Sequence, residues 1–506
     1  MTRTLGLSAL LFGSLIVSAL FTTGCYSYSG DCKFNYSCEE GGAGGSTTTT
    51  GTGGAPPSCI PSNNSSPVDD SCGVFVSSSK GEDTNAGTKE KPFATITMAL
   101  NSAPGKPVYL CGENLLESVE ISQNAALYGA LDCASDWKYV AGQKSVLSAS
   151  GDMVPLRVGS KAKASLFDVA LRSEDAMLPG GSSIALIAEG ESELNLTRCS
   201  VEAGNGQNGQ DGDDFVDPAL DGLNGADGLN ACIANQVVTP DPPTGSCGDV
   251  MSAGGLGGIG TSAQGGSGAP GLPDGAMNGG AGEGAAVCTD GQPGNDGMVG
   301  SPGAGAQGMG ALQAGLGFVP AAGADGQPGG VAQGGGGGGG AKGGTGSGKC
   351  PTGTTGGASG GTGASGGCGG LGGKGGKGGG SSIGILNLGA QIVFQDVTIT
   401  TKAGGKGGNG GAGQLGGLGG AGGKGGQKVN FVNLNNACAG GNGGKGGDGG
   451  KGGGGRGGHS IGIAHAGTAP DTTGATITPG SAGLGGTGEG DTGNGADGLG
   501  VAVQGF

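Results

Sequence analysis

The chain is poor in aromatic residues, histidine and metal-type cysteine pairs, and each shortage disfavours a class of function. Aromatic residues make up 4% of the 506 residues, and Trp137 and Tyr139 are the neighbouring pair considered for stacking on a sugar. The two histidines, His459 and His465, have no nucleophile motif such as G-x-S-x-G beside them. We expect His465 to be a surface residue. No C-x-x-C pair occurs, so the cysteines lack the spacing of a zinc site.

Basic residues are scarce as well. The net charge of −16 disfavours nonspecific binding of nucleic acid, which requires an excess of Lys and Arg. No Lys or Arg occurs between Arg198 and Lys342, whereas Lys is frequent between Lys374 and Arg456. One interpretation is that both segments carry charge for solubility. The other is that the acidic and basic segments dock on each other.

The acidic segment contains a candidate metal site. Asp211, Asp213, Asp214 and Asp217 offer the oxygen ligands that Ca²⁺ prefers. Their spacing does not match an EF-hand, and a solvated acidic loop is the alternative. Asp168 and Asp396 are expected to hydrogen-bond turns between strands rather than to catalyse a reaction. No catalytic residue and no cofactor other than this Ca²⁺ is predicted.

The N-terminus predicts export. An apolar run from Leu5 to Phe21 follows Arg3 and is too short to span a membrane. It ends in Gly24-Cys25, which resembles the lipobox of bacterial lipoproteins, although Thr22 replaces the usual Leu. The resemblance implies lipidation of Cys25 and a membrane anchor in the cell envelope or on the outer surface. Ordinary signal cleavage is the alternative.

Export makes disulfides possible, and the chain has 14 Cys. Without Cys25 the number is odd, which leaves one Cys free or intermolecular. Pairs between neighbours in sequence are predicted, namely Cys32–Cys38, Cys59–Cys72, Cys111–Cys133, Cys232–Cys247 and Cys350–Cys368.

Three short stretches repeat one pattern, and they predict the fold. They are SIALIAEG (183–190), SIGILNLG (382–389) and SIGIAHAG (460–467). Each continues to an aliphatic residue, which is Val201, Ile399 or Ile477, and then into Gly-rich sequence. A unit of about twenty residues with alternating apolar positions is stable only when it stacks on copies of itself. We therefore expect an all-β parallel β-helix with long Gly-rich insertions. The stretches 165–171 and 392–399 resemble each other as successive turns of such a helix do.

The segment that follows Gly73 carries a family resemblance. The chain reads G-x-D-x-N-x-G-T from Gly81 and then P-F-x-T-I-x-x-A-L from Pro92, followed by predicted strands at 107–112, 117–121 and 125–131. A short helix with Pro92 at its start is expected, with Ile96, Ala99 and Leu100 on one face. Residues 73–135 resemble the N-terminal cap of right-handed parallel β-helix proteins of the pectate-lyase-like superfold. That superfold includes polysaccharide lyases and hydrolases, so an enzymatic role becomes an expectation to test.

The insertions predict a second kind of order. From Gly404 to Gly425 and from Gly440 to Gly458 a Gly recurs every third residue, usually followed by another Gly. This period matches three residues per turn in polyproline-II geometry, and Gly lets such helices pack closely. Residues 428–440 are expected to form a hairpin turn between two packed helices of polyglycine-II type. Pro is too rare for a collagen triple helix. The alternative is disorder, because Gly loses the most conformational freedom on folding.

The Gly-rich composition of 203–500 also resembles the repeat region of mycobacterial PE-PGRS proteins, although their helical N-terminal domain is absent. The predicted order is a lipoprotein signal peptide (1–24), a Gly/Ser/Thr-rich tether (25–72), a cap with β-helix turns (73–202), an acidic Gly-rich insertion (203–380), a β-helix turn (381–403), a basic G-G-x insertion (404–458), a β-helix turn (459–480) and a Gly-rich C-terminal segment (481–506).

Together these features predict a lipid-anchored surface protein with a structural or adhesive role, in contact with glycan, matrix or a cell-surface protein. A β-helix polysaccharide lyase or hydrolase is the alternative, and a cluster of Lys or Arg with carboxylates on one exposed sheet would favour it. Binding of ice or another ordered surface by the Gly-rich part is a further hypothesis.

Overall fold

The structure is a computed structural model that describes residues 59–63, 66–273, 277–313, 315 and 317–506. The predicted signal peptide, the lipidation at Cys25, the pair Cys32–Cys38 and most of the tether lie outside the described residues. The last part of the tether, 59–63 and 66–72, contains two short 3-10 helices, η1 (Pro61–Asn63) and η2 (Asp70–Cys72). It packs against the first sheet, with Val68 buried among aromatic rings.

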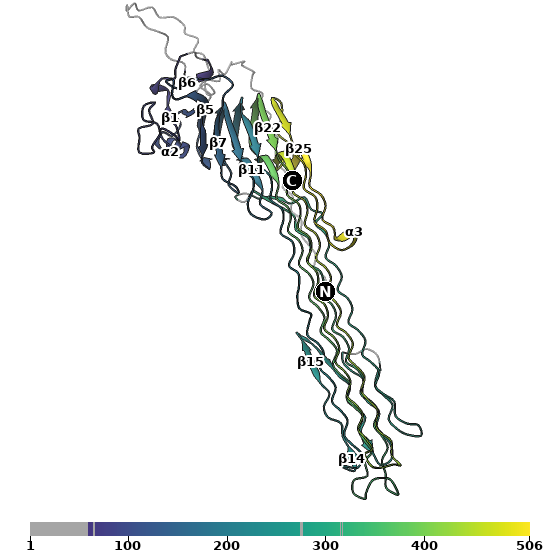
Figure 1. Cartoon of the computed structure of the whole chain (residues 1–506). Helices are drawn as coiled ribbons and strands as arrows, with labels where there is room; N and C mark the ends of the chain where they lie inside the picture. The colour runs from purple at the N-terminus through teal and green to yellow at the C-terminus, as the bar shows by residue number, and fades with distance from the viewer. Residues whose placement is uncertain (1–58, 64–65, 274–276, 314, 316) are drawn as a thin grey trace, which may run out of the picture. The chain divides into compact units, whose positions relative to one another are not determined.

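The fold is all-β, with three sheets of parallel strands (Figure 1). Sheet 1 contains β1 (Val74–Val76), β2 (Val108–Cys111), β5 (Ala125–Asp132), β9 (Lys163–Phe167), β12 (Glu193–Thr197) and β21 (Gln391–Gln395), and the short β6 (Lys138–Tyr139) is antiparallel to β5. Sheet 2 contains β3 (Asn114–Leu116), β7 (Ser145–Ala149), β10 (Val169–Ser173), β13 (Ser200–Ala203), β22 (Val397–Thr401) and β24 (Ala475–Thr478). Sheet 3 contains β4 (Val119–Ile121), β8 (Leu156–Val158), β11 (Ser183–Ala188), β20 (Ser382–Asn387), β23 (Ser460–His465) and β25 (Gly500–Gly505).

From β2 to β23 the chain visits sheets 1, 2 and 3 in that order again and again, so each passage stacks on the one before it. The three repeated stretches are adjacent strands of sheet 3, with Ser183, Ser382 and Ser460 aligned. Their aliphatic partners Val201, Ile399 and Ile477 are aligned in sheet 2. Stacking in register, as the repeat predicted, is confirmed.

The core lies between the sheets and consists of the inward aliphatic side chains. Leu166, Leu196 and Ile385 belong to one continuous buried cluster that includes residues of all three sheets. Between sheets 1 and 2 the chain turns through single residues with positive φ, such as Asp168 (φ 55°) and Asp396 (φ 55°). Both aspartates therefore lie in turns, as expected, but the carboxylate of Asp168 accepts hydrogen bonds from the side chains of Arg198 and Tyr139 rather than from its own turn.

The first passage is covered by a short helix, α2 (Ile96–Ser102). Ile96 and Ala99 are fully buried and Leu100 is partly buried against the same core, which confirms the predicted apolar face. The helix does not begin at Pro92, because Thr95 is its N-cap and accepts a hydrogen bond from the Met98 N–H. The carboxylate of Asp83 accepts the N–H groups of Ala94 and Thr95, which holds this turn in place.

All the Gly-rich insertions leave the sheets at the same corner. Successive connections from sheet 2 to sheet 3 are 117–118, 150–155, 174–182, 204–381, 402–459 and 479–499. We call the described residues of the last three connections the glycine-rich sheaf. It includes three short antiparallel pairs and one helical turn, namely β14 (Gln236–Val237) with β17 (Gly260–Thr261), β15 (Thr244–Cys247) with β16 (Val250–Ala253), β18 (Ala311–Gln313) with β19 (Gly317–Val319), and α3 (Gly490–Gly493).

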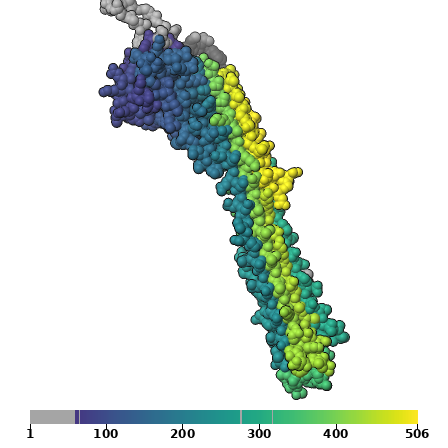
Figure 2. Space-filling view, viewed as in Figure 1, coloured from purple at the N-terminus to yellow at the C-terminus, as the bar shows by residue number. Residues whose placement is uncertain are grey.

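Hydrogen bonds between neighbouring segments hold the sheaf together. Residues 437–459 run back along 404–427, with N–H···O bonds at every third residue from Ala437→Gly426 to Gly458→Gly405. The predicted hairpin is therefore confirmed. Figure 2 shows 479–499 (yellow) lying against this hairpin, where Gly483 N–H donates to Gly458 O. Disorder of the described Gly-rich segments is thus the wrong alternative.

Two glycines in three are needed because each faces a different neighbour. Gly440 N–H donates to Gly423 O, and Gly441 N–H donates to Gly336 O on another segment. A Cβ at Gly440 would stand 2.0 Å from Thr362 O, and one at Gly441 2.1 Å from Gln292 O. In each G-G-x unit, only the third position does not face a neighbouring segment in this way, so a side chain can be placed there.

Five disulfides link the described residues, and two of the predicted pairs, Cys59–Cys72 and Cys111–Cys133, are confirmed. The predicted pairs Cys232–Cys247 and Cys350–Cys368 are wrong. Within the sheaf the bonds are Cys232–Cys350, Cys247–Cys368 and Cys288–Cys438. They join segments distant in sequence because outgoing and returning segments lie side by side. Cys199 is the free, buried cysteine of the described part.

Candidate functional site

A ladder of Asn and Asp side chains binds the acidic segment to the basic one. Eight Asn and Asp residues of 205–230 each accept a backbone N–H of 403–427 at the side-chain Oδ1 atom, at 2.6–3.0 Å. The pairs are Asn205–Ala403, Asn208–Lys406, Asp211–Asn409, Asp214–Ala412, Asp221–Leu418, Asn224–Ala421, Asp227–Lys424 and Asn230–Gln427. This confirms docking of the two segments. The contact is made by these side chain–backbone hydrogen bonds together with backbone–backbone bonds such as Gly209 N–H to Lys406 O, and not by charge alone.

The ladder also places the predicted calcium ligands. Asp211 and Asp214 point at backbone N–H groups of the neighbouring segment. Asp217 uses its backbone oxygen to accept a hydrogen bond from the Gln414 side chain. Among the described residues, no group of three or more His, Cys, Asp or Glu is arranged to hold a metal ion. Calcium binding by these residues and Asp213 stays a prediction, without a ligand cluster to support it.

The corner where the sheaf leaves the sheets is built on the serine that opens each repeat. Ser183 Oγ accepts the Gly204 N–H at 2.8 Å, Ser382 Oγ accepts the Lys402 N–H at 2.9 Å, and Ser460 Oγ accepts the Gly480 N–H at 2.8 Å. Each serine is fully buried. Each therefore satisfies the first N–H that departs from sheet 2, where an unpaired buried donor would be costly.

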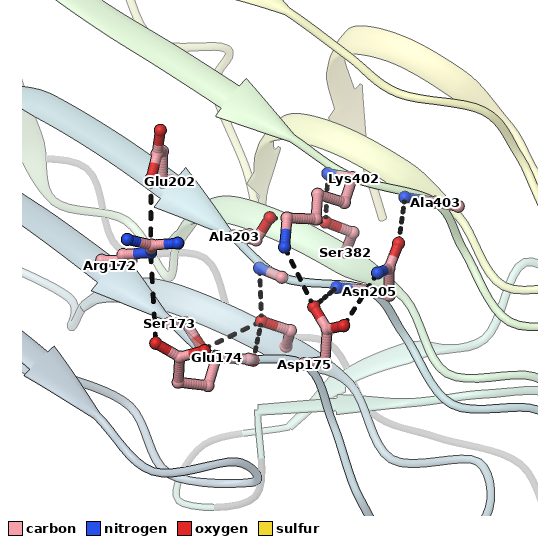
Figure 3. Close-up of polar contacts among 12 residues, drawn as sticks. Arg172, Ser173, Glu174, Asp175, Glu202, Ala203, Asn205, Ser382, Lys402 and Ala403 are labelled. Carbon is pink, nitrogen blue, oxygen red and sulfur yellow. Dashed lines mark hydrogen bonds and ion pairs between the residues drawn. The ribbon is translucent and has the colours of Figure 1, made fainter.

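Charged groups surround this corner on its exposed side (Figure 3). Asp175 accepts the Asn205 N–H at 2.8 Å and also contacts Lys402 Nζ at 3.2 Å. The Asn205 N–H is the main reason that the pKa of Asp175 is lowered. Arg172 lies 3.6 Å from the Glu202 carboxylate and 4.0 Å from that of Glu174.

This cluster contains the residue types that the enzyme hypothesis required. Sequence reasoning did not identify it, because its members come from β10, β13, β22 and the loops that follow them. Its chemistry does not fit the hypothesis, however. Its cations are paired with carboxylates, and Asp175 is held ionised at a backbone N–H. A general acid or base needs a pKa close to the working pH.

Two hollows away from this corner are also candidate binding sites. One, of about 510 Å³, lies beside sheet 3 and is lined by Glu120, Asp152, Arg157 and Phe318 among others. Arg157 is paired with Glu189 at 2.8 Å, and Asp152 accepts the N–H groups of Met177 and Leu178. Arg157 and Asp152 of this hollow are thus engaged in structural contacts.

The second hollow, of about 360 Å³, lies at the hairpin turn 428–436. We call 232–237, 344–355 and 428–436 the tip loops. Cys232–Cys350 joins the first two, and Asn433 N–H and Nδ2 donate to Gly348 O and Ser347 O of the second. Three apolar side chains of the tip loops are exposed, namely Ile233 (55%), Val429 (46%) and Val432 (75%). Val429 has φ of 43°, which is unusual for a β-branched residue.

The histidines have structural roles. The prediction that His465 lies at the surface is wrong. It ends β23 between β20 and β25, and it is 7% exposed. His459 accepts the Leu499 N–H at Nδ1, so its Nε2–H donates to Met309 O at 2.8 Å. Burial lowers the pKa of His459, and this neutral ring ties three segments of the sheaf together.

A row of stacked rings on sheet 1 was missed because its members are far apart in sequence. Phe75, Tyr109, Tyr128 and Phe167 stack in order with centroids 4.7–5.5 Å apart, and Trp137 packs edge-on against Phe75. Trp137 is 2% exposed and is therefore not available for stacking on a sugar.

Comparison of the chain with protein-family models, with curated proteins and with solved structures found no match. In the part of the chain that the structure describes, no helix is long and apolar enough to span a bilayer.

Proposed function

We propose that this chain is an exported, lipid-anchored surface protein with a structural or adhesive role. In this proposal the three sheets form a right-handed parallel β-helix, as the resemblance of residues 73–135 to pectate-lyase-like caps implies. The sheaf consists of packed polyglycine-II-type helices. The N-terminal lipid at Cys25 anchors the chain in the cell envelope, and the sheaf presents its loops to glycan, matrix or another cell surface.

One observation carries this proposal. The sheaf is held by backbone hydrogen bonds, and three disulfides lock segments that are more than a hundred residues apart in sequence. Such an arrangement provides a stiff support with little side-chain chemistry of its own. Contact then falls to the tip loops, where Val429 and Val432 are exposed beside Lys428 and a hollow.

The test is binding of the full-length protein to immobilised cells, matrix proteins and glycans. Val432→Asp in the tip should weaken binding by about tenfold or more, because burying one Val side chain contributes about 1.5–3 kcal/mol. Met298→Asp is the matched control, since Met298 is 84% exposed in the Gly-rich segment 291–303. Equal binding by both variants and the unchanged protein would refute the role of the tip loops. The anchor is tested separately by loss of fatty-acid labelling in Cys25→Ala.

A further inference from the structure

Asn–Gly sequences are the least stable peptide sequences in an exposed chain, and the sheaf contains many of them. In deamidation the Gly nitrogen attacks the Asn side-chain carbon Cγ. The attacking nitrogen loses its proton, ammonia leaves, and a cyclic succinimide forms. Water then opens the ring to Asp or to isoaspartate. Isoaspartate adds one methylene to the main chain, which would shift the three-residue register of every later contact in that segment.

In the sheaf both reacting groups are engaged. Asn224 Oδ1 accepts the Ala421 N–H at 2.8 Å, and the next N–H, that of Gly225, donates to Ala421 O at 2.8 Å. One neighbouring residue thus holds the side-chain carbonyl and the attacking nitrogen at once. We call this two-bond arrangement the Asx–Gly clamp.

The clamp recurs at other Asn–Gly and Asp–Gly sequences that have a parallel neighbour. The residues that form it with both bonds to a single neighbour are Asn205, Asn208, Asp211, Asp221, Asn224, Asp227, Asp290, Asp296 and Asn409. Between antiparallel neighbours the geometry changes in a regular way. Gly422 N–H donates to Asn442 Oδ1, and Gly443 N–H donates to Gly420 O, two residues earlier. The residues that follow this second pattern are Asp325, Asn442, Asp448, Asn494 and Asp497.

We propose that the Asx–Gly clamp protects the Asn–Gly sequences that form it from deamidation. Two features of the clamp carry this proposal. The Gly N–H points at a neighbouring carbonyl, so the nitrogen cannot approach Cγ unless that bond breaks. The Oδ1 bond fixes the side chain, so Cγ cannot rotate toward the nitrogen either. Both Asn and Asp occur at equivalent positions, because the side chain of either residue offers the one acceptor oxygen that the clamp requires.

The experiment follows deamidation of the intact, disulfide-bonded protein at pH 8 and 37 °C by peptide mass spectrometry. Asn208 and Asn224 should react about thirtyfold more slowly than in the reduced, urea-unfolded chain, which corresponds to two net hydrogen bonds of about 1 kcal/mol each. Thr352→Asn places a new Asn–Gly in the loop 344–355, where Gly353 has φ of 96°, and this site should react at the unfolded rate. Native rates equal to unfolded rates would overturn the proposal.

A second variant separates the clamp from rigidity in general. The Ala421 N–H donates to Asn224 Oδ1, and proline at 421 removes this donor while its φ still suits a three-residue helix. Ala421→Pro should therefore accelerate deamidation of Asn224 and leave Asn208, whose partner is Lys406, unchanged. If Asn224 reacts no faster in this variant, the clamp is not the cause of its protection.

Discussion

A single methyl group at the centre of the sheaf should open it. A Cβ added at Gly410 would stand 1.8 Å from Gly452 O, far inside van der Waals contact. The nearest atoms belong to the backbone of Gly452 and Gly453, which cannot rotate away as a side chain could. Gly410→Ala therefore forces the hairpin segments apart. Two bonds made at this level are lost, Gly410 N–H to Thr487 O and Gly452 N–H to Gly411 O.

The cost can be worked from these contacts. Two net hydrogen bonds contribute about 1 kcal/mol each, and overpacking adds about 1–3 kcal/mol. A local destabilisation of about 3 kcal/mol raises the open population by about a hundredfold. Cleavage by a protease that cuts before Leu, at Leu415 and Leu418 of the same segment, reports that population when opening is fast.

Ala421→Lys is the matched control. Residue 421 is exposed and stands in the same three-residue register as Lys406 and Lys424, so its larger side chain should change cleavage by less than about threefold. The reasoning fails if Gly410→Ala resists the protease as well as the unchanged protein does. It fails equally if the outward lysine opens the segment as much as the inward methyl.

Three further outcomes follow from the contacts described. Cys288→Ser should lower the stability of the sheaf by about 2–5 kcal/mol, because the bond to Cys438 closes the longest described loop; melting with and without reductant measures this. Arg198→Ala should lower the free energy of unfolding by about 2–3 kcal/mol, because it leaves the buried Asp168 carboxylate without its ion-pair partner at 2.7 Å; thermal unfolding measures this. The Arg198 side chain is partly exposed, which keeps the cost below that of a fully buried pair. The pKa of His459 is depressed on folding, so its contribution is fully present above pH 6.5 and is lost as pH falls from 6.5 toward the folded pKa. The melting temperature should therefore drop between pH 7 and pH 5, and His459→Gln should remove part of that drop.

The repeating part of the fold was accessible from sequence because its signal is local. The serine of each repeat and the alternating aliphatic residues recur at fixed spacing, and these residues stack in register. The hairpin at 428–440 was accessible for the same reason. The role of Ser183 could not be predicted from the sequence, because its hydrogen-bond donor, the Gly204 N–H, belongs to the next passage of the chain through the sheets.

The disulfides of the sheaf could not be paired from spacing. Cys232 and Cys247 are close in sequence, but the segment that returns from the tip loops brings Cys350 and Cys368 beside them. The Asx ladder could not be predicted for a related reason. The backbone N–H groups that Asp211 and Asp214 accept belong to a segment about two hundred residues later, so the sequence suggested only that these carboxylates could bind a cation.

Amide hydrogen exchange on the intact chain tests the central claim, that backbone hydrogen bonds order the Gly-rich segments. Residues 356–381, 404–427 and 437–459 donate N–H groups to neighbouring segments along their length. We predict that their amides exchange orders of magnitude more slowly than those of an unstructured chain. A fragment that lacks the sheets should lose much of this protection. Exchange at the unstructured rate in the intact protein would contradict the sheaf, and with it the proposal that this protein presents its tip loops on a stiff support.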